Sequence, residues 1–379
     1  MTDSSVDAPS VAVADGTPAT TTGKSLSVVA LRKTYGDVVA VDDASMEIAA
    51  GEFVTFLGAS GSGKTTTLMM IAGFCEPDSG TITVGGHDVT RLAPQRRNLG
   101  FVFQQYLLFP HMTVGENVAF PLQLRGVPKG EIRRRAGEAL EIVGLSGFAG
   151  RRPHELSGGQ QQRVALCRAL VYRPPVILMD EPLGALDKKL RDQLQTEIKA
   201  IQRELGLTVI YVTHDQEEAL VLSDRIAVMR DGGIEQFDSP RELFERPRTP
   251  FVADFLGAAN FLPGRVERGA DEDTLVRLDQ CGGLVRARPQ ALAAGTPVTV
   301  AVQPCRLRAG APDDGFCAGR VETVTYVGSL VRAGVRVDGG EAPLLRLEVP
   351  AGRAPVVGER VGVTADPEDV NLFPVEQGG

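Results

Sequence analysis

The residues best able to do chemistry form a run of small and hydroxylated side chains around one lysine, between Gly58 and Thr66. Glycines let successive backbone N–H groups turn toward a phosphate, and a helix that starts directly after them adds the positive end of its dipole. Lys64 supplies a point charge for β- and γ-phosphates, and the Thr65 hydroxyl is a ligand for Mg²⁺. The pattern predicts a nucleotide site with these phosphate-binding residues: Gly58, Ser60, Gly61, Ser62, Gly63, Lys64, Thr65 and Thr66.

An acidic pair, Asp180-Glu181, directly follows the apolar run Val176–Met179. Acidic side chains at the carboxyl end of a buried parallel strand point into the crevice where such sheets bind ligands. Asp180 is expected to hold Mg²⁺, directly or through water, and Glu181 to polarise an attacking water as a general base. Such a pair alone is usually a loop or a helix cap. Beside a phosphate loop it predicts nucleotide hydrolysis.

Two further side chains are expected at the same edge of the sheet. The strand-like run TVIYVT at 208–213 delivers His214, whose position fits a contact to the γ-phosphate, although a lone histidine is normally a cap or a surface residue. Gln104 follows a short strand at 99–103 and is expected to orient water or Mg²⁺ from the side. The predicted catalytic residues are Glu181, His214 and Gln104, and the predicted Mg²⁺ ligands are Thr65, Gln104 and Asp180.

A second anion-binding pattern, LSGGQ at 156–160, runs into the helical sequence QQRVALCRAL. Ser157, Gly158 and Gly159 can present N–H groups and a hydroxyl at the start of a helix. Two phosphate-type sites with only one lysine-bearing loop make sense if the second completes the nucleotide pocket of another copy of the chain. The alternative is a plain helix cap. The pattern therefore predicts that the protein works as a pair.

These residues have to be positioned by a mainly parallel sheet covered by helices, because short β-branched runs alternate with helical patterns from Ser25 onward. The segment 114–146 predicts a helical insertion that packs on its own domain. Beyond Pro250 the helical periodicity ends and strand-like segments follow in two similar copies. GRVE at 264–267 recurs at 319–322, and the alternating apolar residues Val298, Val300 and Val302 recur as Val361, Val363 and Ala365. This repeat predicts a duplicated small β-barrel.

Composition narrows the classes of function. The 379 residues suit two or three domains, and a content of 43% hydrophobic and 23% charged residues is typical of a soluble globular protein. The net charge of −8 argues against nucleic acid as the main partner. The five cysteines form no C-x-x-C pair, and no apolar run approaches the roughly 18 residues of a membrane span. Residues 1–24 predict a disordered tail rather than a signal peptide, and hence a cytoplasmic protein.

From about Ser25 onward, the chain resembles an ATP-binding-cassette ATPase. GASGSGKT resembles the Walker A motif, VILMDE the Walker B motif, LSGGQ the signature and GALD at 184–187 the D-loop, while Gln104 and His214 resemble the Q-loop and switch residues. Tyr35 stands where the family stacks an aromatic side chain on adenine. The resemblance implies an α/β P-loop cassette over residues 25–259, with a helical subdomain at about 105–175. A small all-β, OB-like barrel of the TOBE type is expected over 260–379.

The resemblance further implies ATP and Mg²⁺ as cofactors and a head-to-tail homodimer that sandwiches two ATP molecules. The residues expected to act on the partner's nucleotide are Ser157, Gly158, Gly159, Gln160 and Asp187. In the family, the region near 103–114 receives a coupling helix of the permease, and Leu107, Leu108 and Phe109 are expected to be exposed there. The implied place of work is the cytoplasmic face of the membrane, held by the permease, with a solute-binding protein as an indirect partner.

Two segments, 101–122 and 201–220, look closest to the importer ATPases for polyamines (spermidine and putrescine). Importers of iron(III), of sulfate or thiosulfate, and of phosphonate are alternatives, because the solute does not touch this subunit. A soluble cassette ATPase outside transport is a remote alternative, since such proteins usually join two cassettes or insert a coiled coil. A regulatory module without hydrolysis is disfavoured by the intact Glu181 and His214. The barrel carries Gln303-Pro304-Cys305 where many relatives have Arg-Pro-Glu.

Overall fold

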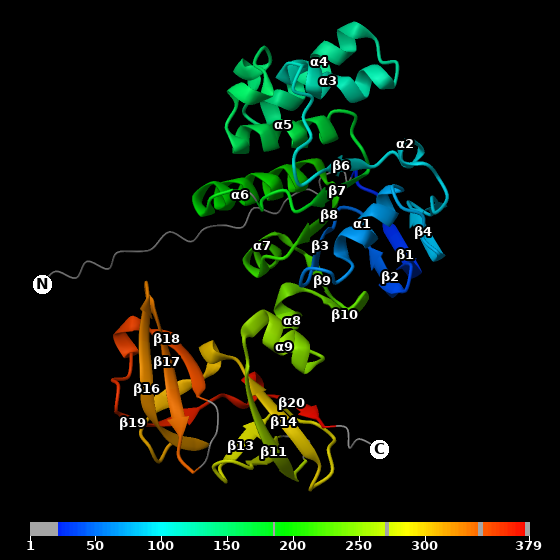
Figure 1. Cartoon of the computed structure of the whole chain (residues 1–379). Coiled ribbons are helices and arrows are strands. Elements are labelled where there is room, and N and C mark those ends of the chain that lie inside the picture. Colours follow the sequence, from blue (N-terminus) through cyan, green and yellow to red (C-terminus); the bar gives the residue numbers. More distant parts are fainter. Residues whose placement is uncertain (1–21, 185, 270–272, 340–343, 376–379) are drawn as a thin grey trace, which may run out of the picture. The chain divides into compact units, whose positions relative to one another are not determined.

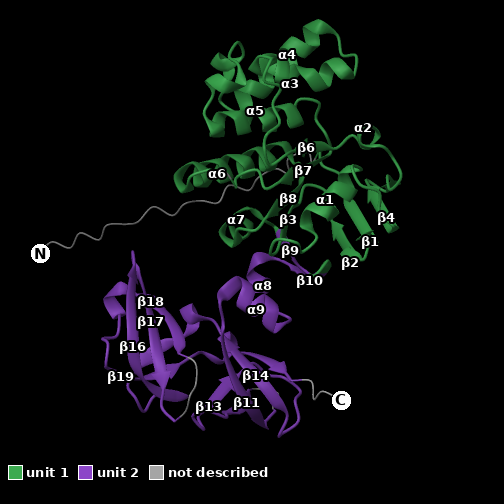
Figure 2. Cartoon of the chain, viewed as in Figure 1, with its two compact units in different colours: residues 1–224, 231–233 green, residues 225–230, 234–379 purple. Residues whose placement is uncertain are grey.

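The computed structural model describes residues 22–184, 186–269, 273–339 and 344–375 (Figure 1). The predicted disordered tail lies outside the described residues except for its last three, 22–24. The chain divides into two compact units (Figure 2): residues 1–224 with 231–233, and residues 225–230 with 234–379. The predicted domain boundary at 259/260 stays a prediction.

The first unit contains a parallel sheet, and three of its strands are buried along their whole length. Four of its strands lie in the order β3 (Phe53–Leu57), β8 (Thr208–Thr213), β7 (Val176–Asp180) and β6 (Gly100–Val102). Continuous apolar runs are what a parallel sheet covered on both faces requires. The mainly parallel sheet predicted from the sequence is confirmed. Because the strands are parallel, the residues that follow them in the chain meet at one edge.

An antiparallel sheet of the same unit carries the first hairpin of the chain. Its strands lie in the order β2 (Val38–Ile48), β1 (Leu26–Tyr35), β4 (Ser79–Val84) and β5 (His87–Asp88). Tyr35 pairs with Val38 across the two-residue turn at 36–37, where Gly36 has a φ of 59°. The hairpin therefore ends at the aromatic residue that the family resemblance assigned to the base.

The helices of the first unit differ in what they cover. Four helices lie on or next to the parallel sheet: α1 (Lys64–Ala72), α2 (Pro94–Arg97), α6 (Lys188–Leu205) and α7 (Gln216–Leu222). A further group, uppermost in Figure 1, consists of α3 (Val114–Leu124), α4 (Lys129–Ile142) and α5 (Gly158–Leu170), with 3₁₀ turns at Ser146–Phe148 and Pro153–Glu155. Of these three helices, α5 also contacts β6 of the parallel sheet. Within the described residues, no helix has the length and apolar character to cross a bilayer.

The second unit begins with β9 (Arg225–Arg230), β10 (Gly233–Asp238), α8 (Pro240–Glu245) and α9 (Pro250–Gly257). The expectation that helical structure ends at Pro250 is wrong. Proline occupies the first turn of α9, where its missing N–H would have no partner in any case, and the Thr249 hydroxyl accepts from the N–H of Val252. Here proline starts a helix instead of ending one.

The remainder of the second unit forms two five-stranded sheets. One has the order β13 (Leu284–Ala287), β12 (Thr274–Leu278), β11 (Asn260–Arg268), β14 (Pro297–Val302) and β20 (Asn371–Pro374). The other has the order β15 (Arg308–Gly310), β19 (Arg360–Thr364), β16 (Cys317–Val327), β17 (Leu330–Val337) and β18 (Leu345–Pro350). Short 3₁₀ turns lie at Pro304–Arg306, Ala351–Arg353 and Pro367–Asp369.

The two copies of GRVE occupy equivalent strands, which confirms the predicted duplication. β11 lies between β12 and β14, and β16 lies between β17 and β19. A Cβ on Gly264 would lie 2.7 Å from the carbonyl oxygen of Arg277, and a Cβ on Gly319 would collide with that of Arg336. In each copy, the glutamate pairs with the arginine whose carbonyl oxygen the glycine approaches: Glu267 pairs with Arg277, and Glu322 pairs with Arg336. Glycine lets the strands approach closely, and each copy places an equivalent ion pair at the surface beside it.

Candidate active site

The phosphate loop joins the buried strand β3 to α1. Gly61 and Gly63 have φ values of 83° and 96°, which a residue with a side chain adopts only at a cost. A Cβ on Gly63 would also lie 2.6 Å from the carbonyl oxygen of Ala40, so the loop rests directly on the backbone of β2. Ser60 and Gly61 are exposed at the tip. The loop thus has the glycine backbone that lets N–H groups turn toward an anion at the start of a helix.

Lys64 is buried beneath this loop. Its ammonium donates to the carbonyl oxygens of Gly58 and Ala59, both at 2.8 Å, and lies 3.5 Å from the Ser62 hydroxyl. Burial lowers the pKa of the ammonium, while Glu181 and Asp180 act in the opposite direction. The Lys64 ammonium is therefore a buried positive charge that neutral carbonyl oxygens hold in place, and it can interact with the negative charge of a bound phosphate.

Thr65 and Asp180 come together at the carboxyl edge of the sheet. The Thr65 hydroxyl donates to Asp180 Oδ1 at 3.1 Å. Burial raises the pKa of Asp180 more than the hydrogen bond from Thr65 lowers it. Two adjacent oxygen ligands, one of them a carboxylate that is costly to ionise without a counter-charge, fit Mg²⁺ by its preference for oxygen.

Glu181 brings the other two predicted catalytic residues together. Its carboxylate accepts from Gln104 Nε2 at 3.2 Å and lies 3.2 Å from His214 Nδ1. Gln104 thus contacts Glu181, and no hydrogen bond to Thr65 or Asp180 is present for it among the described residues. The φ of Glu181 is 41°, a left-handed value that costs about 1–3 kcal/mol for such a residue. Its N–H donates to the carbonyl oxygen of Val212 at 3.0 Å, which helps to hold that backbone.

The LSGGQ segment starts α5 with a capping box. The N–H of Gln160 donates to the Ser157 hydroxyl at 3.4 Å, and the N–H of Ser157 donates to the Gln160 side chain at 3.0 Å. Gly159 is buried, and a Cβ there would lie 2.9 Å from the Leu190 side chain. Asp187 caps α6 through the N–H of Leu190 at 3.0 Å. In the described part of the chain, no hydrogen bond joins 157–160 to the phosphate loop. Their action on a partner's nucleotide stays a prediction.

Tyr35 stands at the end of the β1–β2 hairpin with 54% of its surface exposed. Its hydroxyl lies 3.2 Å from Cys75 Sγ, and the Lys33 ammonium lies 5.6 Å from the ring centroid. Val38 and Val39 beside it are exposed as well. An open aromatic ring with apolar neighbours is suited to stacking on a base.

The expected apolar docking surface is smaller than the sequence indicated. Leu107 is 51% exposed, but Leu108 packs against the hydrophobic core of the unit and Phe109 is half-buried, 4.7 Å from the ring of Phe120. The expectation of exposure holds for Leu107 and is wrong for the other two.

Arg97 is a buried residue that the sequence analysis missed. Its guanidinium donates to four backbone carbonyl oxygens, those of Met70, Ile71, Thr90 and Leu92, at 2.6–2.8 Å. Two of these carbonyls belong to the last turn of α1, where a positive charge is favourable. Arg97 therefore anchors the far end of the helix that begins with the phosphate loop. No sequence motif marks a side chain whose partners are all backbone atoms.

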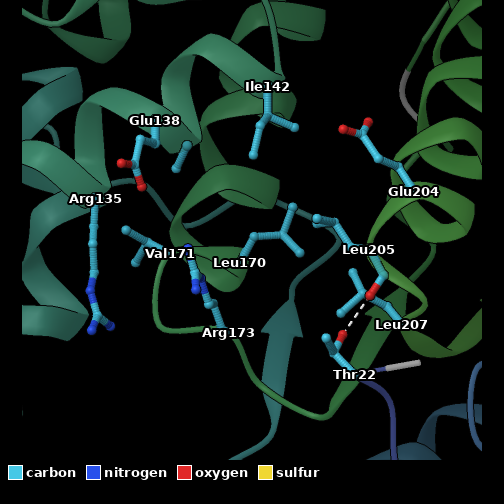
Figure 3. A pocket seen from close by; sticks show the side chains of 11 residues that line it. Thr22, Arg135, Glu138, Ile142, Leu170, Val171, Arg173, Glu204, Leu205 and Leu207 are labelled. Carbon is cyan, nitrogen blue, oxygen red and sulfur yellow. Dashed lines mark hydrogen bonds between the residues drawn. The ribbon is translucent and has the colours of Figure 1, made fainter. Parts of the chain in front are cut away.

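A cavity of about 350 Å³ lies elsewhere in the first unit, near the ends of α4, α5 and α6 (Figure 3). Apolar side chains such as Leu170 and Ile142 share its wall with Arg135, Glu138, Arg173 and Glu204. None of the predicted site residues lines it. Its lining also lacks the convergent phosphate-binding groups of the loop after β3.

Two different families of known proteins match two separate segments of the chain. The family model described as ABC transporter matches residues 41–184, and the one described as TOBE domain matches residues 300–373. A solved ATP-binding cassette, described as a dimeric post-hydrolysis state bound to ADP and Pi, has a TM-score of 0.52 and 37% identity. The match covers 57% of this chain and 99% of that one.

Full-length relatives extend the similarity to most of the chain. The spermidine/putrescine import ATP-binding protein PotA of Rubrobacter xylanophilus is 51% identical over 88% of this chain and 89% of its own length. The protein of the same name from Acidothermus cellulolyticus is 47% identical over 93% and 94%. The Fe(3+) ions import ATP-binding protein FbpC of Agrobacterium fabrum is 47% identical over 82% and 87%.

Proposed function

Because this chain belongs to the ATP-binding-cassette transporter family, we propose that it is the ATP-hydrolysing subunit of an importer for the polyamines spermidine and putrescine. The single observation that carries the enzymatic part is the position of Glu181, which contacts both Gln104 and His214. The polyamine part rests on relatives of that name at 47–51% identity over most of the chain.

The proposed mechanism places each side chain at one part of the nucleotide. Lys64 and the N–H groups of residues 60–65 bind the β- and γ-phosphates, and Tyr35 stacks on the base. Glu181 accepts a proton from the water that attacks the γ-phosphorus, and the bond to the bridging oxygen breaks to leave ADP and inorganic phosphate. Gln104 and His214 orient the carboxylate and the water. Mg²⁺, when bound by Thr65 and Asp180, neutralises charge on the phosphates.

The proposed working unit is a pair of chains. Ser157, Gly158, Gly159, Gln160 and Asp187 of each copy would complete the nucleotide pocket of the other. The dimeric state of the similar solved cassette supports this arrangement. Transmembrane permease subunits would hold the pair at the cytoplasmic face of the membrane. A solute-binding protein would be an indirect partner.

Uptake of labelled spermidine tests the transport function. Cells whose only copy carries Glu181→Gln are expected to lose uptake. Cells with Glu217→Gln, an exposed acid three residues beyond His214, are expected to keep it. Normal uptake by the Glu181→Gln cells would refute the polyamine assignment. Labelled iron(III) would then be tested first in the same strain, because the iron importer subunit of Agrobacterium fabrum is 47% identical to this chain, with sulfate and phosphonate after it.

A further inference from the structure

We propose that Asp78 is a positioning residue for Tyr35 and thereby sets the affinity of the site for the nucleotide base, which Asp78 itself does not touch. The inference rests on the proposed function, since Tyr35 has a base to bind only if the site takes a nucleotide. Asp78 lies in the loop before β4 and belongs to none of the motifs that form the phosphate site.

The carboxylate of Asp78 binds both residues that precede Tyr35. Oδ2 accepts from the N–H and the hydroxyl of Thr34, each at 2.7 Å, and Oδ1 accepts from the Lys33 ammonium at 2.8 Å. The N–H of Asp78 donates in turn to the carbonyl oxygen of Arg32 at 2.9 Å. These four bonds hold the last three residues of β1 before Tyr35, Arg32 to Thr34, against the loop that contains Asp78. The pKa of Asp78 is lowered to about 2, chiefly by the bond from Lys33, so the carboxylate is ionised at neutral pH.

The side chain of Tyr35 also contacts the loop at 75–78, directly through its hydroxyl and indirectly through Lys33. The Lys33 ammonium that binds Asp78 also lies over the ring of Tyr35 and donates to the carbonyl oxygen of Glu76 at 2.8 Å. The Tyr35 hydroxyl lies 3.2 Å from Cys75 Sγ. Residues 75–78 thus bind the residues that precede Tyr35 and, through Cys75, its hydroxyl, while Lys33 lies over one face of the ring. The rest of the ring stays open to a ligand.

The hairpin that carries Tyr35 is in direct contact with the phosphate loop. A Cβ on Gly63 would lie 2.6 Å from the carbonyl oxygen of Ala40 in β2. Tyr35 pairs with Val38, two residues before Ala40. At about 3.3 Å per residue, the tyrosine stands roughly 7 Å along the strand from that contact. A ribose fills such a gap between base and phosphates.

A ring that is ordered before binding loses less conformational freedom when the base stacks on it. Without Asp78, Thr34 and Lys33 lose their shared acceptor, and the end of β1 is held less tightly, by its pairing with β2 and the bond from Lys33 to Glu76. Base binding then weakens, whereas the phosphate loop and Glu181 keep all their contacts. The expected consequence is a change in KM for ATP without a change in kcat.

The test is steady-state ATP hydrolysis by the purified full-length chain, with inorganic triphosphate as a competitive inhibitor that has phosphates but no base. Asp78→Ala is expected to raise KM for ATP about fivefold at unchanged kcat, a share of the effect of a whole stacking contact. The inhibition constant of triphosphate is expected to stay the same. Asp78→Asn keeps an acceptor for Thr34 but lacks the negative charge for Lys33. Its KM for ATP is therefore expected to lie between that of the unmodified chain and that of Asp78→Ala.

Asp88→Ala is the matched control. Asp88 accepts from the N–H and the hydroxyl of Thr90 at 2.8 and 2.6 Å, so it makes the same kind of contact in a turn that does not reach Tyr35. Its KM for ATP is expected to equal that of the unmodified chain. An equal rise of KM in Asp88→Ala and Asp78→Ala would mean general loosening of the sheet and would overturn the proposal.

Tyr35→Ala separates the two possible failures. It is expected to raise KM for ATP about tenfold, as loss of one stacked base does, and adding Asp78→Ala to it should raise KM no further. If Tyr35→Ala leaves KM unchanged, the proposed base site itself is refuted. If Tyr35→Ala raises KM and both Asp78 variants do not, the base site stands and the positioning role of Asp78 is refuted. A rise in the inhibition constant of triphosphate equal to the rise in KM in Asp78→Ala would also refute the positioning role of Asp78.

Discussion

Substitution of Glu181 by glutamine is the sharpest perturbation of the proposed chemistry. Glutamine has the shape of glutamate, and its carbonyl oxygen can still accept from Gln104 Nε2, now 3.2 Å from the carboxylate. The contacts of Lys64 to the phosphate loop do not involve Glu181 and survive. Only the capacity to accept a proton from water is lost. We therefore expect nucleotide binding to be kept while hydrolysis stops.

The size of the effect follows from the single interaction removed. Loss of a positioned general base lowers kcat by about 10²–10⁴-fold, which corresponds to about 3–5 kcal/mol of activation free energy. The affinity for ATP should stay within about threefold or increase, because a negative charge near the γ-phosphate has been removed. Because the ATP-bound dimer dissociates after hydrolysis, this dimer should accumulate when hydrolysis is blocked.

Single-turnover hydrolysis and light scattering with Mg-ATP measure these two consequences. The control is Glu217→Gln, in the first turn of α7, whose carboxylate makes an exposed pair with Lys188 at 3.5 Å. It should retain normal turnover. A Glu181→Gln chain with more than about a tenth of the original turnover would show that Glu181 is not the general base. Lost turnover without any ATP-dependent dimer would contradict the composite site.

Three further predictions concern other parts of the first unit. Lys64→Ala should weaken ATP binding itself in equilibrium dialysis, and an unchanged affinity at an unchanged melting temperature would contradict its role. Arg97→Met should lower the free energy of unfolding by about 2–4 kcal/mol in urea, because four buried carbonyl oxygens lose their donor; a smaller loss would mean that water replaces the guanidinium. Burial raises the pKa of Asp180 above 3.8, so the nucleotide-free chain should gain stability as pH falls through that raised pKa. Thermal melting against pH should show this gain in the unmodified chain and not in Asp180→Asn.

The sequence predicted the centre of the site because its residues follow the strands directly. Lys64, Asp180 and His214 each come within seven residues of the end of a buried apolar run. In a parallel sheet the carboxyl ends of neighbouring strands share one edge. Local order along the chain is therefore enough to place these side chains together. The duplication could be predicted for a similar reason, because each copy of GRVE carries its own glycine and glutamate within four consecutive residues.

Side chains whose partners are distant backbone atoms could not be found in this way. Arg97 binds carbonyl oxygens of residues 70, 71, 90 and 92, and Asp78 binds the end of β1, more than forty residues earlier. In the sequence, Arg97 looks like any arginine at the end of a short helix, and Asp78 looks like any aspartate in a loop. The half-burial of Leu108 and Phe109 depends likewise on the helices that pack beside them.

The sequence by itself determined which groups stand at the sheet edge, because motif spacing and strand order are local properties of the chain. Only the tertiary structure decided how those groups are held. It placed Gln104 and His214 on Glu181, gave Glu181 a left-handed backbone, and tied Tyr35 to the loop at 75–78. Such contacts join residues far apart in the chain, and they form because buried polar groups must find partners wherever packing brings them.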